Sequence, residues 1–348
     1  MKIGLVIYGS LNTLSGGYMY DRKLVEYLRA QGDRVEIISL PWRNYGSHLI
    51  DNFSFKLPAN FDILIQDELN HPSLIGANRG EHPYPIISLV HHLRCSELRP
   101  KWQNDLYRII EKKYLQSVDG FIFNSQTTKG VVNGLMVHEK PSVVAYPPTD
   151  RFGEAISEEE IKSRATREPL RILFLGNVIE RKGLHTLLEA VGNQKSKVKL
   201  NVIGSLTSEP EYVKRLQAYV STNNLSSFVY FHGALDNEPL IEMLKQAHVL
   251  IVPSSYEGFG IVYLEGMGFG LPAIGTTAGA AGEIIEHGKT GYLIEPNDSS
   301  MLATHINQLA LDRDLLGQLS INARNRYAQQ PSWNENANQI RNFLQSMI

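Results

Sequence analysis

The stretch RILFLGNVIERKGLHTLLEAV, residues 171 to 191, decides the fold of this chain. A short apolar run is followed by a polar loop and then by apolar residues at helical spacing. This order predicts a buried strand, a loop and a helix, the repeating unit of a parallel α/β sheet. The loop places Arg181 and Lys182 at the end of the strand, where α/β sheets bind ligands. Two cations there favour a diphosphate site, and a solvated loop is the ordinary alternative.

The same alternation extends over all 348 residues. Further strands are expected at KIGLVIY, RVEIISL, FDILIQ, PIISLV, DGFIFN and SVVAY, and then at KLNVIG, FVYFHG, HVLIVPS, PAIGT and GYLIEP. The charged, apolar-poor segment 148–169 interrupts the series and is expected to be a linker. The sequence therefore predicts an α/β protein of two doubly wound, Rossmann-like domains, 1–147 and 170–330, facing a central cleft. Residues 331–348 form a last amphipathic helix.

Composition excludes several classes of protein. A formal net charge of −2 argues against nucleic-acid binding, which needs a positive field. The single cysteine, Cys95, forms no internal disulfide and no thiolate metal site. The opening MKIGLVIYGS is too short in apolar residues for a signal peptide, and no run approaches the roughly 18 apolar residues of a membrane span. We expect a cytoplasmic protein.

A second stretch, EGFGIVYLEGMGFG at residues 257–270, follows the expected strand HVLIVPS. The amides of Gly258, Phe259 and Gly260 would lie at the N-terminus of a helix and cradle an anion. Glu257 and Glu265 are suited to accept hydrogen bonds from sugar hydroxyls. The alternatives are a helix-dipole contact for Glu257 and a solvated helix face for Glu265.

In the first domain, Gly16 and Gly17 follow the strand KIGLVIY and let the backbone approach a ligand, or simply form a flexible turn. His91 and His92 end the strand PIISLV, and only one of two neighbours should face a ligand. No further metal ligand stands near them at usable spacing, so a structural histidine is the ordinary reading. The Asp-x-Asp motif at 312–314 reads as a charge cluster between helices.

Together these motifs resemble the retaining glycosyltransferases of family 4, which have the GT-B fold and a Glu-x7-Glu signature. The resemblance covers nearly the whole chain and includes SGGYMYDRKLVEYLRAQGDRVEII, VHH, FIFNSQ, FLGNVIERKGLHTLLEAV and AGEIIEHGKTGYLIEP. It implies a C-terminal helix that crosses back to the N-terminal domain. It also implies an enzyme that moves a sugar from a UDP- or GDP-sugar to an acceptor hydroxyl, with retention, in glycan, glycolipid or polysaccharide synthesis. No metal and no cofactor would be required.

The resemblance also implies roles for individual residues. Arg181 and Lys182 would stabilise the leaving diphosphate, Glu265 would hold the ribose, and His91 would contact the donor sugar. The presence of His92, where the family usually has Asp or Asn, leaves the acceptor contacts open. The implied catalytic residues are His91, Arg181, Lys182 and Glu257, and the implied donor-binding residues are Gly16, Gly17, Gly258, Phe259, Gly260 and Glu265.

Two alternative functions stay open, namely a nucleotide-sugar epimerase or phosphorylase of GT-B fold and a non-catalytic nucleotide-sugar-binding subunit. The acceptor is expected to be a sugar, a lipid-linked molecule or a small molecule. Residues 99–117, RPKWQNDLYRIIEKKYLQS, form a basic amphipathic stretch with Trp102, Leu106 and Ile109 near one side. Such a helix can lie on the inner face of a membrane. The ordinary alternative is a domain helix with its apolar side on the sheet.

Overall fold

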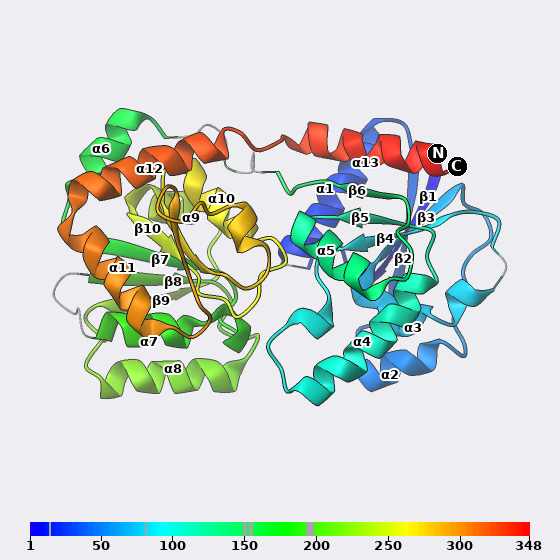
Figure 1. Cartoon of the computed structure of the whole chain (residues 1–348), viewed down its shortest axis with the longest axis horizontal. Helices are drawn as coiled ribbons and strands as arrows, with labels where there is room; N and C mark the ends of the chain where they lie inside the picture. The colour runs from blue at the N-terminus through cyan, green and yellow to red at the C-terminus, as the bar shows by residue number, and fades with distance from the viewer. Residues whose placement is uncertain (14, 81, 149–151, 153–155, 193–197) are drawn as a thin grey trace. The chain divides into compact units, whose positions relative to one another are not determined.

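The computed structural model of the chain describes residues 1–13, 15–80, 82–148, 152, 156–192 and 198–348. The chain divides into two compact units (Figure 1). The first comprises Met1–Pro148 together with Pro331–Ile348, and the second comprises Thr149–Gln330. Each unit contains a six-stranded sheet in which the paired strands are parallel. The expected pair of Rossmann-like α/β units is confirmed.

The sheet of the first unit has the strand order β2-β1-β3-β4-β5-β6. Its central strands read as nearly continuous apolar runs because helices bury both faces of a parallel sheet. The register places Ile3 of β1 opposite Val35 on one side and Ile63 on the other. The strands are β1 (Lys2–Tyr8), β2 (Arg34–Leu40), β3 (Ile63–Asp67), β4 (Ile86–Val90), β5 (Gly120–Phe123) and β6 (Ser142–Val144).

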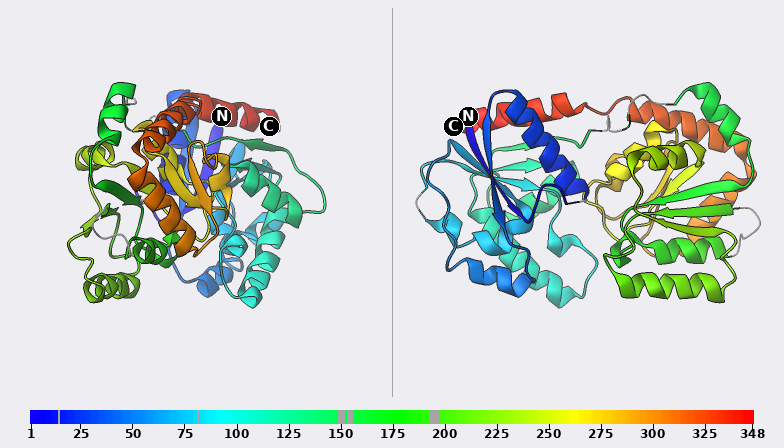
Figure 2. Two further views of the ribbon diagram at one scale, coloured as in Figure 1. Left: turned by 60° about the vertical axis from the view of Figure 1, so that its left-hand side comes forward. Right: turned by 180° about the vertical axis from the view of Figure 1, so that it is seen from behind.

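Alternate residues of these strands point into two different cores. Ile3 and Leu5 pack with α1 (Gly16–Ala30) and α13 (Trp333–Met347), so these two helices share one face of the sheet (Figure 2). Val6 packs on the opposite face with side chains of three other helices, α3 (His71–Leu74), α4 (Lys101–Gln116) and α5 (Gln126–Leu135). A short helix, α2 (Tyr45–Asp51), and the 3-10 turns η1 (Glu68–Asn70), η2 (Ala77–Arg79) and η3 (Arg94–Ser96) complete the unit.

The helix α13 confirms the expected return of the chain to the first domain. A capping box between Ser332 and Glu335 fixes its start. Its apolar stripe enters the core beside α1, and Arg341 on its other side bonds Asp33 at 2.7 Å. The buried residues of the stripe are Ala337, Ile340 and Leu344.

The sheet of the second unit has the order β12-β11-β10-β7-β8-β9. Its strands are β7 (Leu170–Leu175), β8 (Val198–Ile203), β9 (Val229–Gly233), β10 (Val249–Ile251), β11 (Ala273–Thr276) and β12 (Gly291–Ile294). Its main helices are α7 (Leu184–Gly192), α8 (Pro210–Thr222), α9 (Asn237–Gln246), α10 (Ile261–Gly268), α11 (Ser299–Leu311) and α12 (Arg313–Tyr327).

The segment 148–169, expected to be a linker, carries a helix. Residues Glu158–Ala165 form α6, which begins with a capping box between Ser157 and Glu160. Ile161, the one large apolar residue of α6, is fully buried, and α6 packs beside α12. Residues 149–151 and 153–155 of the expected linker lie outside the described part of the chain. Capping and a single buried anchor stabilise this helix, which its composition alone did not predict.

None of the helices in the described residues is both long enough and apolar enough to cross a lipid bilayer.

Candidate active-site residues

The basic loop of the second unit lies between β7 and α7. Arg181 and Lys182 belong to a 3-10 turn, η4 (Glu180–Lys182), and Gly183 follows it with φ at +69°. A Cβ at Gly183 would lie 2.1 Å from the carbonyl oxygen of Pro253. The missing side chain therefore lets this loop pass directly against the segment that follows β10.

This close passage brings Lys182 to Glu257. The Lys182 Nζ and a Glu257 carboxylate oxygen are 2.5 Å apart, and the Ser254 hydroxyl donates to the same oxygen at 2.6 Å. Arg181 donates to the carbonyl of Tyr256 at 2.5 Å. Three of the four implied catalytic residues thus lie together within one unit.

Glu257 is only 6% exposed, yet it is ionised. Burial raises the pKa of a carboxyl group, but here the charges of Lys182 and Arg181 and the hydrogen bonds from Lys182 and Ser254 outweigh it. They lower the pKa of Glu257 to about 2. The helix-dipole explanation is therefore insufficient for Glu257, because its main partners are side chains of the basic loop and of Ser254.

The glycine-rich stretch after β10 leads into α10. Gly260 is the N-cap, with φ at +93°, so the amides of Gly258, Phe259 and Gly260 immediately precede the helix, as expected. Glu265 on α10 is 3% exposed, which excludes the solvated-face alternative.

The glycines next to Glu265 on α10 let this helix pack closely against its neighbours. A Cβ at Gly266 would lie 3.0 Å from Leu250, and one at Gly268 would lie 2.8 Å from Tyr327.

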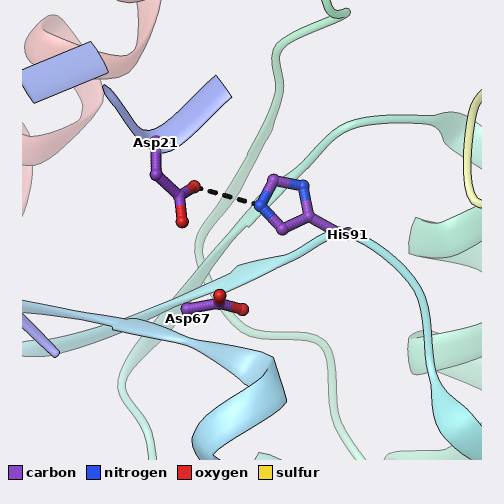
Figure 3. Close-up of side chains that lie close together, drawn as sticks. All are labelled: Asp21, Asp67 and His91. Carbon is purple, nitrogen blue, oxygen red and sulfur yellow. Dashed lines mark hydrogen bonds and ion pairs between the residues drawn. The ribbon is translucent and has the colours of Figure 1, made fainter. Parts of the chain in front are cut away.

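His91 directly follows β4 in the first unit. Its Nε2 and an oxygen of Asp21 on α1 are 3.0 Å apart (Figure 3). Gly17, also on α1, lies under the ring, because an added Cβ would be 3.2 Å from the imidazole Cδ2. Gly16 is the first residue of α1. His92 pairs instead with Glu97, at 3.1 Å, so the two histidines contact different elements.

The expectation that no further ligand stands near His91 is wrong. Asp21 from α1 and Asp67 from the end of β3 each place a carboxylate oxygen within 4.8 Å of a His91 ring nitrogen and of each other. The three residues are far apart in sequence, and only the strand order brings them together. The one sequence signal was the four-residue spacing of Gly17 and Asp21, which puts both on one face of α1.

A second buried group contains Glu68, His71 and Glu111, with the same spacing of ligand atoms. Its members have partners within the unit: His71 bonds Tyr45 at 2.8 Å, and Glu111 accepts from the amide of Cys95 at 3.1 Å. By distance, each of the two groups can accommodate a cation. The motif at 312–314 has a different role, since Asp312 caps α12 by accepting from the amide of Leu315.

Comparison with known proteins gives matches among the glycosyl transferases. Residues 156–326 match the family of glycosyl transferases group 1. The chain is 27% identical to the D-rhamnosyltransferase WbpZ of Pseudomonas aeruginosa over 71% of its own length and 67% of that protein. The alignments with three other curated relatives cover only 39–47% of those proteins.

Solved structures show the same fold at low identity. A sucrose-phosphate synthase from Thermosynechococcus elongatus superposes with a TM-score of 0.83 at 19% identity, covering 99% of this chain and 98% of that one. Anabaena HepE in complex with UDP-glucose superposes with a TM-score of 0.76, also at 19% identity, covering 99% and 100%. The chain therefore has the GT-B fold, and residues 156–326 of it are similar to the glycosyl transferases group 1.

Proposed function

We propose that the protein is a retaining glycosyltransferase of family 4 that transfers a sugar from a UDP- or GDP-sugar to an acceptor hydroxyl. The observation that carries this proposal is the contact of the half-buried Lys182, beside Arg181, with the buried Glu257 in the region that matches the glycosyl transferases group 1. The UDP-glucose in the HepE structure supports a nucleotide-sugar donor. The names of curated relatives support a role in glycan synthesis.

In this proposal the second unit stabilises the departing diphosphate. The bond between the anomeric carbon and the diphosphate oxygen breaks, and its electron pair leaves with the diphosphate. The acceptor oxygen bonds to the same face of that carbon, and its proton passes to the diphosphate. Arg181 and Lys182 offset the growing negative charge, as fixed positive groups do best in a water-poor site. Ionised Glu257 holds Lys182 in place.

The remaining site residues take the roles that the resemblance gives them. The amides of Gly258, Phe259 and Gly260 bind donor phosphate or sugar oxygens at the start of α10. Glu265, almost fully buried on the same helix, accepts hydrogen bonds from the ribose hydroxyls. Gly16, Gly17 and His91 belong to the first unit, where His91 contacts the donor sugar. Cationic side chains and helix-end amides stabilise the diphosphate, and no metal is needed for that charge.

A donor assay tests the proposal. Purified protein is incubated with UDP- and GDP-sugars, and release of nucleoside diphosphate is followed with and without EDTA. We expect one donor class to be turned over and the rate to survive chelation. The anomeric configuration of the product, read by NMR, is expected to match the donor.

The same assay separates the alternatives. A new sugar isomer still attached to the nucleotide would indicate an epimerase, and a sugar phosphate a phosphorylase. Binding without turnover of any donor would indicate a non-catalytic subunit. Loss of activity with EDTA that Mg²⁺ restores would contradict metal independence.

We also propose that α4 docks on an anionic membrane surface. Trp102, Leu106 and Ile109 are exposed by 67%, 50% and 56%, so the apolar side of α4 does not pack on the sheet. The helix instead buries Glu111, Tyr114 and Leu115. Exposed basic residues, Lys101, Arg108 and Lys113, lie on the same helix and complement anionic lipid.

Vesicle sedimentation tests this contact. Wild-type protein is expected to pellet with phosphatidylglycerol-containing vesicles at low salt and to be released by salt, because the Debye length falls. Replacing Arg108, Lys112 and Lys113 by Gln should release it, at about 1 kcal/mol per basic residue near the surface. The matched control replaces three exposed bases of the second unit, Lys214, Arg215 and Lys245, by Gln. Equal loss in both triple variants, or wild-type protein in the supernatant, would contradict the proposal.

A further inference from the structure

The imidazole of His91 is seated on the first two turns of α1. Asp21 contacts Nε2 (Figure 3). Gly17 leaves space under the ring, and the ring of Tyr20 meets the imidazole edge-on with centroids 5.5 Å apart. Residues 17 and 21 are one helical turn apart, so one face of α1 provides both the space and the carboxylate. We call Gly17 and Asp21, as they lie against the His91 ring, the seat of His91. This seat is built by the helix and not by the loop before it.

The surroundings hold this seat rigid. Asp21 is fully buried, and Ser15 caps α1 by accepting from the amide of Tyr18. Tyr20 is itself anchored, since its hydroxyl donates to the carbonyl of Ala145 and its ring packs against Trp333 of α13. Rotation of the imidazole would break its contact with Asp21.

The carboxylates around His91 favour the protonated imidazole. Burial lowers the pKa of His91, but Asp21, Asp67 and Glu68 outweigh it and raise the value to about 9. Burial and the charge of Asp21 raise the pKa of Asp67 to about 7, although His91 opposes the shift. These carboxylates favour the doubly protonated form of the His91 ring, in which one N–H is engaged by Asp21.

We propose that Asp21 and Gly17 are positioning residues that fix His91 with Nε2 bound to Asp21 and Nδ1 available to a ligand oxygen. Within the described part of the chain, Nδ1 of His91 has no hydrogen-bond partner, and the side chain is 17% exposed. A charged donor at this position suits a sugar hydroxyl or a phosphate oxygen. Only the identity of this ligand rests on the proposed glycosyl transfer.

Histidine NMR on the protein without ligand tests the seat directly. With ¹³C,¹⁵N-labelled histidine, the His91 signals are assigned by their loss in His91→Asn. In wild-type protein we expect a titration midpoint well above the ordinary value of about 6.5. Asp21→Asn is expected to lower it by about one unit or more, a roughly tenfold change in protonation. Gly17→Ala is expected to change the Nε2 shift, because its Cβ displaces the ring.

The control is Asp33→Asn, which removes another buried carboxylate of the same unit. Asp33 pairs with the N-terminal amine and with Arg341, so this variant should leave the His91 signals unchanged. A His91 midpoint near 6.5 in wild-type protein would overturn the inference, as would equal effects of Asp21→Asn and Asp33→Asn. Binding of Zn²⁺ or Mg²⁺ to Nε2 would also overturn it, by assigning the three side chains to a cation.

Kinetics add a second readout, which is interpreted only for folded variants because unfolding also lowers the apparent kcat. Asp21→Asn is expected to lower kcat more than it raises the donor KM, with an unchanged circular dichroism spectrum. If no donor is turned over by wild-type protein but the His91 titration behaves as expected, the glycosyltransferase proposal fails and the seat stands. Normal kcat in a folded Asp21→Asn variant would overturn the positioning role.

Discussion

Replacing Arg181 or Lys182 by alanine is expected to lower kcat by about 100- to 1,000-fold, with a smaller change in donor affinity. Removing one group that stabilises transition-state charge typically costs about 2.7–4 kcal/mol. The structure distinguishes the two variants, because Lys182 is paired with buried Glu257 and Arg181 bonds a backbone carbonyl. Steady-state kinetics and calorimetry with nucleoside diphosphate provide the two quantities.

The Lys182→Ala variant needs a second variant that controls for its loss of stability. Without Lys182, Glu257 becomes a buried carboxylate that has lost its closest cation, and breaking such a pair typically costs about 3–5 kcal/mol of stability. Lys182→Ala combined with Glu257→Gln removes that charge, so comparing its kcat with that of Glu257→Gln alone reports the loss of the cation with less unfolding. The control is Arg215→Ala, whose exposed pair with Glu180 should contribute little. Near-normal kcat in folded Arg181→Ala and Lys182→Ala variants would contradict the assignment.

Replacing Gly270 by alanine is expected to destabilise the second unit by about 2–5 kcal/mol. Gly270 has φ at +62°, where an L residue costs roughly 1–2 kcal/mol. Its Cβ would also lie 2.5 Å from Ile161 of α6, and overpacking typically costs about 1–3 kcal/mol. Urea unfolding followed by circular dichroism measures the change.

The positions of the tryptophans show which unit the Gly270→Ala variant destabilises. The three tryptophans, Trp42, Trp102 and Trp333, all belong to the first unit, so their fluorescence follows that unit alone. The control is Gly317→Ala in α12, where the nearest neighbour of the new Cβ is 3.8 Å away. It should add about 1 kcal/mol, the helix preference of Ala over Gly. Equal stability of the two variants would contradict the packing role of Gly270.

The twelve strands in the described part of the chain were predictable because each coincides with a short apolar run, and central strands such as β3, β4 and β10 are buried on both faces. The basic loop and Glu257 were also predictable as separate motifs, since both follow strands of the second unit. Their direct contact was not, because it depends on β7 and β10 being neighbours in the sheet. Strand order is set by long-range packing, which leaves little trace in local sequence.

The seat of His91 shows the same limit more strongly. Asp21 reads as an ordinary polar residue of an amphipathic helix, and Asp67 as the polar end of a strand. Apart from the four-residue spacing of Gly17 and Asp21, nothing in either stretch indicates that both aspartates approach His91. The apolar side of α4 was misleading for a different reason: helical periodicity identifies an apolar face but not what covers it. Here Tyr114 and Leu115 of α4 pack in the core beside the sheet instead.

The return of α13 to the first unit has a consequence for biosynthesis. Residues 1–148 emerge from the ribosome long before residues 331–348, because the whole second unit is synthesised in between. At a synthesis rate of about 5–20 residues per second, the core that contains Ile3 and Leu5 therefore lacks Ala337, Ile340 and Leu344 for tens of seconds. During that interval Tyr20 lacks Trp333, so the support under His91 is completed only when the last helix emerges.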